Sequence, residues 1–141
     1  MNKLSKYFIA AVALLLVSSL LLIMWTYWEP SNIRKDTLVY RIMIPTEIKV
    51  FPTWGETDKP NYSVSIADGL KPSAVTMRYL SMLQPAELSM EATKINFTCQ
   101  QYPTSDTVCE KKINAGQTIQ IILDEASSNA NSKVEVIFSG Y

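Results

Sequence analysis

YFIAAVALLLVSSLLLIMWTYW, residues 7–28, is the stretch that organises this 141-residue chain, because it contains no charged side chain and is almost entirely apolar. A helix of roughly 20 apolar residues crosses the hydrocarbon core of a bilayer, which is about 30 Å thick. Residues 8–28 reach that length. Aromatic side chains, which favour the membrane–water boundary, gather at the end of the stretch: Trp25, Tyr27 and Trp28. We therefore predict a transmembrane helix over residues 8–28.

Two basic residues, Lys3 and Lys6, lie before this helix and set its orientation. Positively charged flanks stay in the cytoplasm, so we expect residues 1–7 to form a short cytoplasmic tail and the C-terminal part to lie outside. The short basic tail suits a bacterial inner-membrane protein with a single span, a cytoplasmic N-terminus and a periplasmic C-terminal domain.

A cleaved signal peptide is the alternative interpretation of the same segment. The apolar region of a signal peptide is shorter, about 7–15 residues, and small residues precede the cut. Val17 and Ser19 offer such a pair, but cleavage there leaves a mature chain that begins with Leu20 and further apolar residues. Such a chain is poorly soluble, and the uncleaved anchor is therefore favoured.

The remainder divides into a short linker, residues 29–36 (EPSNIRKD), and one domain of ordinary size, residues 37–141. The chain carries thirteen basic and thirteen acidic side chains, so its formal net charge is zero. It has no basic stripe with interleaved aromatic residues, which argues against a nucleic acid partner. Its neutrality argues against electrostatic binding to lipid. The expected partners are membrane lipid around the N-terminal helix and another envelope or extracytoplasmic protein, and no small-molecule substrate is evident.

Apolar and polar residues alternate in several short runs of the domain, which is the pattern of half-buried β-strands. The runs are residues 38–44, 48–51, 61–66, 93–99, 108–113, 119–123 and 133–138. Their spacing of roughly 8–12 residues is typical of a sandwich or barrel. We therefore expect a mainly β fold, in which the N-terminal transmembrane helix is followed by an antiparallel, immunoglobulin-like β-sandwich.

Residues 73–92 fit both a strand and a helix, and the surrounding β pattern slightly favours the strand. In the other runs, the apolar members of each alternating set are expected to face the interior of the domain. They are Tyr40, Ile42, Val64, Ile66, Ile95, Phe97, Ile119, Ile121, Val136 and Phe138.

The chain has two cysteines, Cys99 and Cys109, and both lie in the part expected outside the cytoplasm, where thiols oxidise. Redox pairs usually have C-x-x-C spacing, and zinc sites usually add histidine, which this chain lacks. We therefore predict a structural disulfide between the two residues. It would join the facing ends of a hairpin whose first strand is residues 93–99, and it would fix the register of the two strands.

Histidine, the commonest metal ligand and a frequent general base, is absent from the chain. The four glycines are isolated, so the sequence has no phosphate-binding loop. Asp124 and Glu125 are adjacent, but in a polar loop such a pair is usually solvated. We therefore predict no catalytic residue, no cofactor, no metal site and no enzymatic activity. A histidine-free enzyme, such as a hydrolase that uses two carboxylates, is the second alternative function.

Trp54 lies in the loop FPTWGETDKP, residues 51–60, among proline, glycine and charged residues. Tryptophan is enriched where binding energy concentrates in interfaces, so Trp54 is the candidate partner contact; alternatively, its ring is a lid over the end of the sandwich. The predicted function is a membrane-anchored extracytoplasmic protein-binding module, either an accessory subunit of an envelope complex or a tethered protein that neutralises a partner. The first alternative is a signal-cleaved, secreted β-domain that acts as an inhibitor or adhesin.

Overall fold

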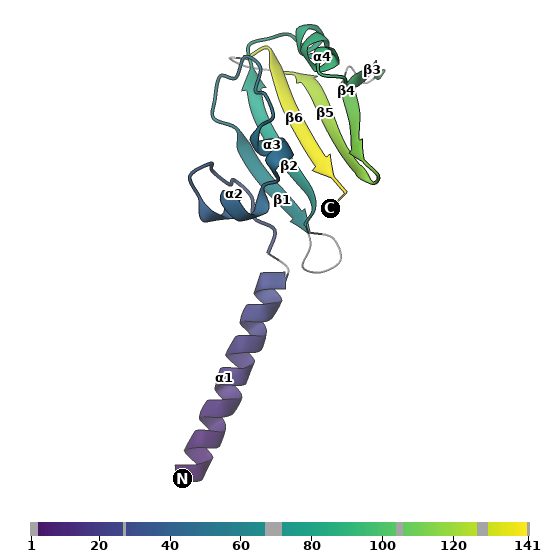
Figure 1. Ribbon diagram of the computed structural model, residues 1–141. Helices are drawn as coiled ribbons and strands as arrows, with labels where there is room; N and C mark the ends of the chain where they lie inside the picture. Colours follow the sequence, from purple (N-terminus) through teal and green to yellow (C-terminus); the bar gives the residue numbers. More distant parts are fainter. Residues whose placement is uncertain (1–2, 27, 67–71, 104–105, 127–129, 141) are drawn as a thin grey trace.

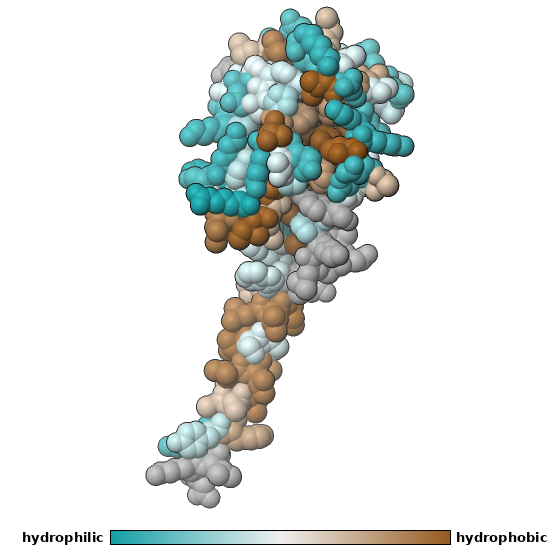
Figure 2. Space-filling view, in the orientation of Figure 1, coloured by the Kyte–Doolittle hydropathy of each residue, from teal (hydrophilic) through white to brown (hydrophobic). Residues whose placement is uncertain are grey.

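A computed structural model describes residues 3–26, 28–66, 72–103, 106–126 and 130–140. One long helix, α1 (Lys3–Thr26), extends away from a domain built on a β-sheet (Figure 1). Its stretch Ser5–Trp25 is long and apolar enough to cross a membrane, a property that a signal sequence shares. The apolar side chains of α1 are exposed, as Figure 2 shows, and Leu14, for example, is 74% exposed. The helix therefore needs an apolar environment that the described domain does not supply.

Six strands form one antiparallel sheet in the order β1-β2-β6-β5-β4-β3. They are β1 (Asn61–Ile66), β2 (Pro72–Ser81), β3 (Thr98–Gln101), β4 (Thr107–Asn114), β5 (Gln117–Glu125) and β6 (Ser132–Ser139). The prediction of a mainly β, antiparallel fold is confirmed. The two-sheet, immunoglobulin-like sandwich is not confirmed, because these strands lie in a single sheet and helices cover one of its faces (Figure 1).

Two short helices, α2 (Leu38–Met43) and α3 (Thr46–Lys49), replace the first two predicted strands. Helix α2 begins after Thr37, whose hydroxyl accepts a hydrogen bond of 3.2 Å from the Tyr40 backbone N–H, and such a cap favours a helix. Alternate residues of α2 therefore do not share a face. Ile42, predicted to be in the core, is 72% exposed, and that prediction is wrong.

The ambiguous stretch, residues 73–92, divides between the two structures that it fitted. Its first part belongs to β2, and its second part belongs to α4 (Pro85–Lys94). Proline suits the first turn of a helix, and the N–H of Gln84 donates a hydrogen bond of 2.8 Å to the Glu87 carboxylate in a capping box. Leu88 is fully buried, so α4 packs its apolar side on the sheet.

The core lies between the sheet and the helices. The alternate residues of β5 and β6 that face the helices are almost completely buried. Most predicted core residues are confirmed as buried: Val64, Phe97, Ile119, Ile121, Val136 and Phe138. Tyr40, Ile66 and Ile95 are partly buried and pack against this core. The strand register inferred from the alternation is therefore correct for the C-terminal half of the domain.

The segment that follows α1 is bound to the outer edge of β1. The N–H of Val64 donates a hydrogen bond of 2.9 Å to the Pro30 carbonyl, and the N–H of Ile33 donates one of 2.9 Å to the Tyr62 carbonyl. Ile33 itself is buried in the core. The residues expected as a linker thus hold the exit of the anchor against the sheet, while the domain boundaries themselves stay a prediction.

Candidate functional site

The sheet has one covered face and one face that we call the bare face. On the covered face, inward residues such as Val75, Met77 and Ile121 are completely buried. On the opposite face, most side chains of the same strands are half-buried or exposed, and Thr76 on β2 is a buried exception. The bare face consists of Arg78, Leu80, Val108, Glu110, Gln120, Ile122, Lys133, Glu135 and Ile137.

Bulky apolar residues occupy the middle of the bare face. Ile122 lies between Val108 on β4 and Glu135 on β6. Ile137 lies two residues after Glu135 on the same side of β6, so it is the diagonal neighbour of Ile122. Diagonal neighbours on a sheet are about 7–8 Å apart, which is within reach of long side chains. The three apolar residues therefore form one continuous strip.

Charged groups border this strip. Arg78 and Glu135 form an ion pair of 2.8 Å, and their side chains are 52% and 23% exposed. The hydrogen bond to Glu135 raises the pKa of Arg78, so the guanidinium stays charged. An apolar centre with a polar, charged border is the anatomy of a protein–protein interface.

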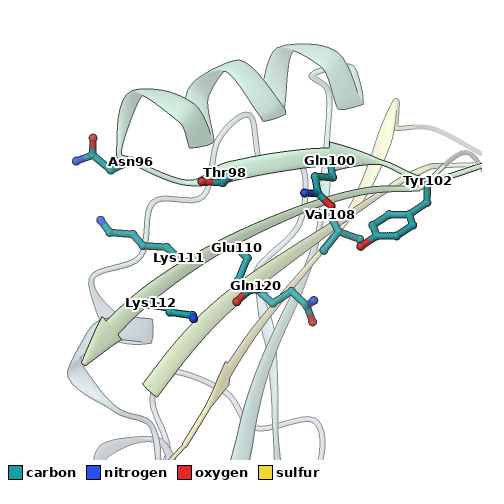
Figure 3. A pocket seen from close by; sticks show the side chains of 9 residues that line it. All are labelled: Asn96, Thr98, Gln100, Tyr102, Val108, Glu110, Lys111, Lys112 and Gln120. Carbon is teal, nitrogen blue, oxygen red and sulfur yellow. The ribbon is translucent and has the colours of Figure 1, made fainter. Parts of the chain in front are cut away.

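An open hollow of about 520 Å³ lies at the β3–β4 side of the bare face (Figure 3). In Figure 3 the Tyr102 ring lies beside Val108 at one end of the hollow, and Lys112 lies toward the other end. Hydrogen-bonding side chains predominate in its lining: Asn96, Thr98, Gln100, Tyr102, Val108, Glu110, Lys111, Lys112 and Gln120. Glu110 is the acidic group in that lining. Amide and hydroxyl groups of this kind can donate and accept hydrogen bonds.

Lys111 lies at the border of the hollow, and its ammonium group is bonded to the protein itself. Its ammonium group donates a hydrogen bond of 2.8 Å to the Ile95 carbonyl and lies 5.6 Å from the centre of the Phe97 ring. Cation–π contacts of this kind are attractive. Lys111 therefore connects β4 to the turn that follows α4.

The predicted disulfide holds the strand that forms the outer wall of the hollow. Cys99 on β3 faces Cys109 on β4, and their sulfur atoms lie at bonding distance, 1.99 Å. The expected hairpin is confirmed by this pairing, although its first strand begins at Thr98 rather than at residue 93. Since β3 is a short edge strand, the cross-link gives it a firm attachment to the sheet.

Trp54 lies away from the bare face. Its ring is half-buried, 5.7 Å from the Phe51 ring, which in turn lies 6.0 Å from the core residue Phe97. The Trp54 carbonyl accepts a hydrogen bond of 2.7 Å from the Ser81 hydroxyl, which binds the loop to the end of β2. This packing is the arrangement that the lid alternative describes. A partner contact at Trp54 stays a prediction.

One pair of carboxylates was missed by the sequence analysis. A hydrogen bond with the Asp106 side chain raises the pKa of Asp124, which lies at the end of β5 opposite Lys133. Asp106 directly precedes β4 and Asp124 lies in β5, and no spacing rule in the sequence links them. Within the described ranges, no group of three or more histidine, cysteine or acidic residues is arranged to hold a metal ion. The carboxylate hydrolase stays an untested alternative.

No protein-family model, curated protein or solved structure matches this chain. Three features of the chain itself bear on its function: the exposed apolar helix, the single sheet with its covered face, and the mixed apolar and polar surface on the other face.

Proposed function

We propose that this chain is a membrane-anchored module that binds another protein outside the cytoplasm, and that the bare face is its contact surface. The apolar helix supports the anchor, and Lys3 and Lys6 before it support a cytoplasmic N-terminus. The bond between Cys99 and Cys109 is compatible with an oxidising compartment, such as the bacterial periplasm. The module would serve as an accessory subunit of an envelope complex or as a tethered protein that neutralises its partner.

The observation that carries this proposal is the apolar strip on the bare face. One face of an antiparallel sheet often contacts water, and its outward positions are then polar. Here Val108, Ile122 and Ile137 occupy central outward positions instead. Apolar surface that is rimmed by polar residues marks interaction sites on soluble domains. A broad sheet face also fits a protein surface better than it fits a small molecule, which prefers an enclosed cavity.

The direct test is affinity purification of the full chain from detergent-solubilised membranes, with Ile137→Glu as the variant. A glutamate in the middle of the strip would bring an unpaired charge into the interface, so we expect the captured partner to be lost while the domain stays folded and its melting temperature falls by only about 10 °C or less. Met90→Glu is the matched control, because Met90 is 64% exposed on α4 and lies outside the bare face. Full capture by a folded Ile137→Glu protein would exclude the bare face as the site.

The anchor and its orientation are tested separately. A reporter that is active only in oxidising compartments, fused after Tyr141, should be active. Mass spectrometry of the mature protein should find an N-terminus at Met1 or Asn2. Cleavage after the apolar segment would instead support a secreted inhibitor or adhesin, and activity of a cytoplasmic reporter alone would reverse the topology.

A further inference from the structure

Helix α2 exposes two apolar side chains on one side. Leu38 is 69% exposed and Ile42 is 72% exposed, and residues four apart lie next to each other on a helix. The other side of α2 is attached to the domain, since the Tyr40 ring lies 5.0 Å from the ring of the buried Tyr62. The exposed pair is therefore presented outward by a helix whose position is fixed.

This side of the domain is the one that the anchor approaches. Figure 1 shows α2 at the end of the domain from which α1 leaves. In Figure 2, brown side chains gather at the lower left of the domain, where Figure 1 draws α2. Helix α1 ends at Thr26 and α2 begins at Leu38, so a short segment joins the two helices.

Hydrogen bonds prevent that segment from carrying α2 far from the anchor. The N–H of Ile66 donates a hydrogen bond of 3.0 Å to the Glu29 carboxylate, and the backbone bonds of Pro30 and Ile33 hold the next residues along β1. When α1 is inserted in a bilayer, α2 is thus held close to the bilayer surface. A tethered group meets its target at a high effective concentration, so even weak affinity suffices for binding.

Basic side chains accompany the apolar pair. Arg34, Lys35 and Arg41 are exposed within the same segment, whereas Asp36 and Glu47 reduce its net positive charge. Lysine and arginine side chains at a membrane surface extend their charged groups toward phosphates while their stems cover apolar area. The contact therefore depends mainly on apolar burial, which is compatible with a chain whose formal net charge is zero.

We propose that α2 is a second membrane contact, which lies on the outer surface of the same bilayer that holds α1. Leu38 and Ile42 enter the boundary between headgroups and acyl chains, and Arg34, Lys35 and Arg41 face lipid phosphates. Amphipathic helices with apolar residues on one side and basic residues around them bind membranes in this way. The inference rests on the membrane anchoring proposed above. Its consequence is that the domain has a fixed orientation on the membrane rather than moving freely on a tether.

Spin labelling of the full chain tests this inference, with the chain inserted in lipid vesicles that contain no other protein. The native cysteines are bonded to each other, so single labels can be placed with Leu16→Cys in α1, Ile42→Cys in α2, and Met82→Cys. Met82 is the matched control, because it is 55% exposed and follows β2 at the end of the domain far from α1. The vesicles contain phosphatidylcholine and phosphatidylglycerol, and the readout is the collision rate of each label with oxygen and with a water-soluble nickel chelate.

We expect the label at position 42 to collide with the nickel chelate several-fold less often than the label at position 82, and more often with oxygen. Equal chelate access at positions 42 and 82, with position 16 protected, would overturn the lipid contact and leave the anchor intact. Chelate access at position 16 would overturn the anchor and this inference together. Protection of position 42 only at a high ratio of protein to lipid would mean that a second copy of the chain covers α2, which also overturns the proposal. Leu38→Cys repeats the test in case the Ile42→Cys protein does not fold.

Discussion

Two neighbouring residues of β6, Ile137 and Phe138, allow a direct test of which face of the sheet packs on the core. Phe138 is 2% exposed and lies between Val75 on β2 and Ile119 on β5. Ile137 precedes it and is half-buried on the bare face. Phe138→Ala should destabilise the domain by about 3–5 kcal/mol, because it removes buried apolar area and leaves a cavity. Ile137→Ala removes side-chain atoms that are partly in contact with water already, so we expect a loss of about 1 kcal/mol.

The two variants are compared by thermal unfolding of the full chain in detergent. The circular dichroism signal of the β-sheet is recorded as the temperature rises. For a domain of this size, a loss of 3–5 kcal/mol lowers the melting temperature by about 15 °C or more. The two substitutions exchange their expected effects if the strand is shifted by one residue, because such a shift moves every side chain to the other face. A larger loss of stability in Ile137→Ala than in Phe138→Ala would therefore refute the assignment of the covered and bare faces.

The disulfide, the Trp54 loop and the buried Tyr79 can each be tested separately. Replacement of Cys99 and Cys109 by serine should destabilise the domain by about 2 kcal/mol, a small loss for a disulfide because the loop that it closes is short. Alkylation of the native, oxidised protein should label neither cysteine. Labelling of both cysteines would contradict the bond. Trp54→Ala should lower the melting temperature, because its ring packs on Phe51; an affinity loss of at least about 2 kcal/mol in a fully stable variant would instead make Trp54 a partner contact. Burial raises the pKa of Tyr79 to about 12 from its usual value of 10.0. The folded state thus favours the neutral phenol, and its contribution to stability is complete below pH 10.0 and is lost as the pH rises toward about 12. Burial also raises the pKa of Tyr62, so an ultraviolet titration should show late ionisation of both tyrosines, and Tyr79→Phe should reduce its amplitude. An unchanged amplitude in Tyr79→Phe would contradict the raised pKa of Tyr79.

The sequence predicts the fold correctly where its pattern of apolar and polar residues fits a strand and does not fit a helix. The runs in β5 and β6 are long enough for alternation to exclude a helix, and the facing cysteines identify the β3–β4 hairpin. The segment from Leu38 to Lys49 is different, because each apolar run is so short that it fits a strand and a helix equally well. The cap at Thr37 and the interruption at Pro45 decide for two helices. With helices in those places, the strands form one sheet rather than two.

The candidate site depends on tertiary structure more strongly than the fold does. The composition of the loop around Trp54 does not reveal that the Trp54 ring packs on the Phe51 ring. The sequence does contain a feature that points to the bare face. Ile122 and Ile137 stand at the outward positions of strands whose inward positions are also apolar, and a strand that is solvated on one side does not need them. Only the register of β5 and β6 brings the two residues together on one surface.

The proposed function requires the bare face to contact a partner protein while α1 holds the chain in a membrane. Site-specific photo-crosslinking in intact cells tests it most directly, with a photoreactive amino acid at position 122 or 137, and at position 90 as the control. We expect one discrete crosslinked protein in the membrane fraction from positions 122 and 137, and no such product from position 90. The same product from all three positions, or a product from position 90 alone, would contradict it.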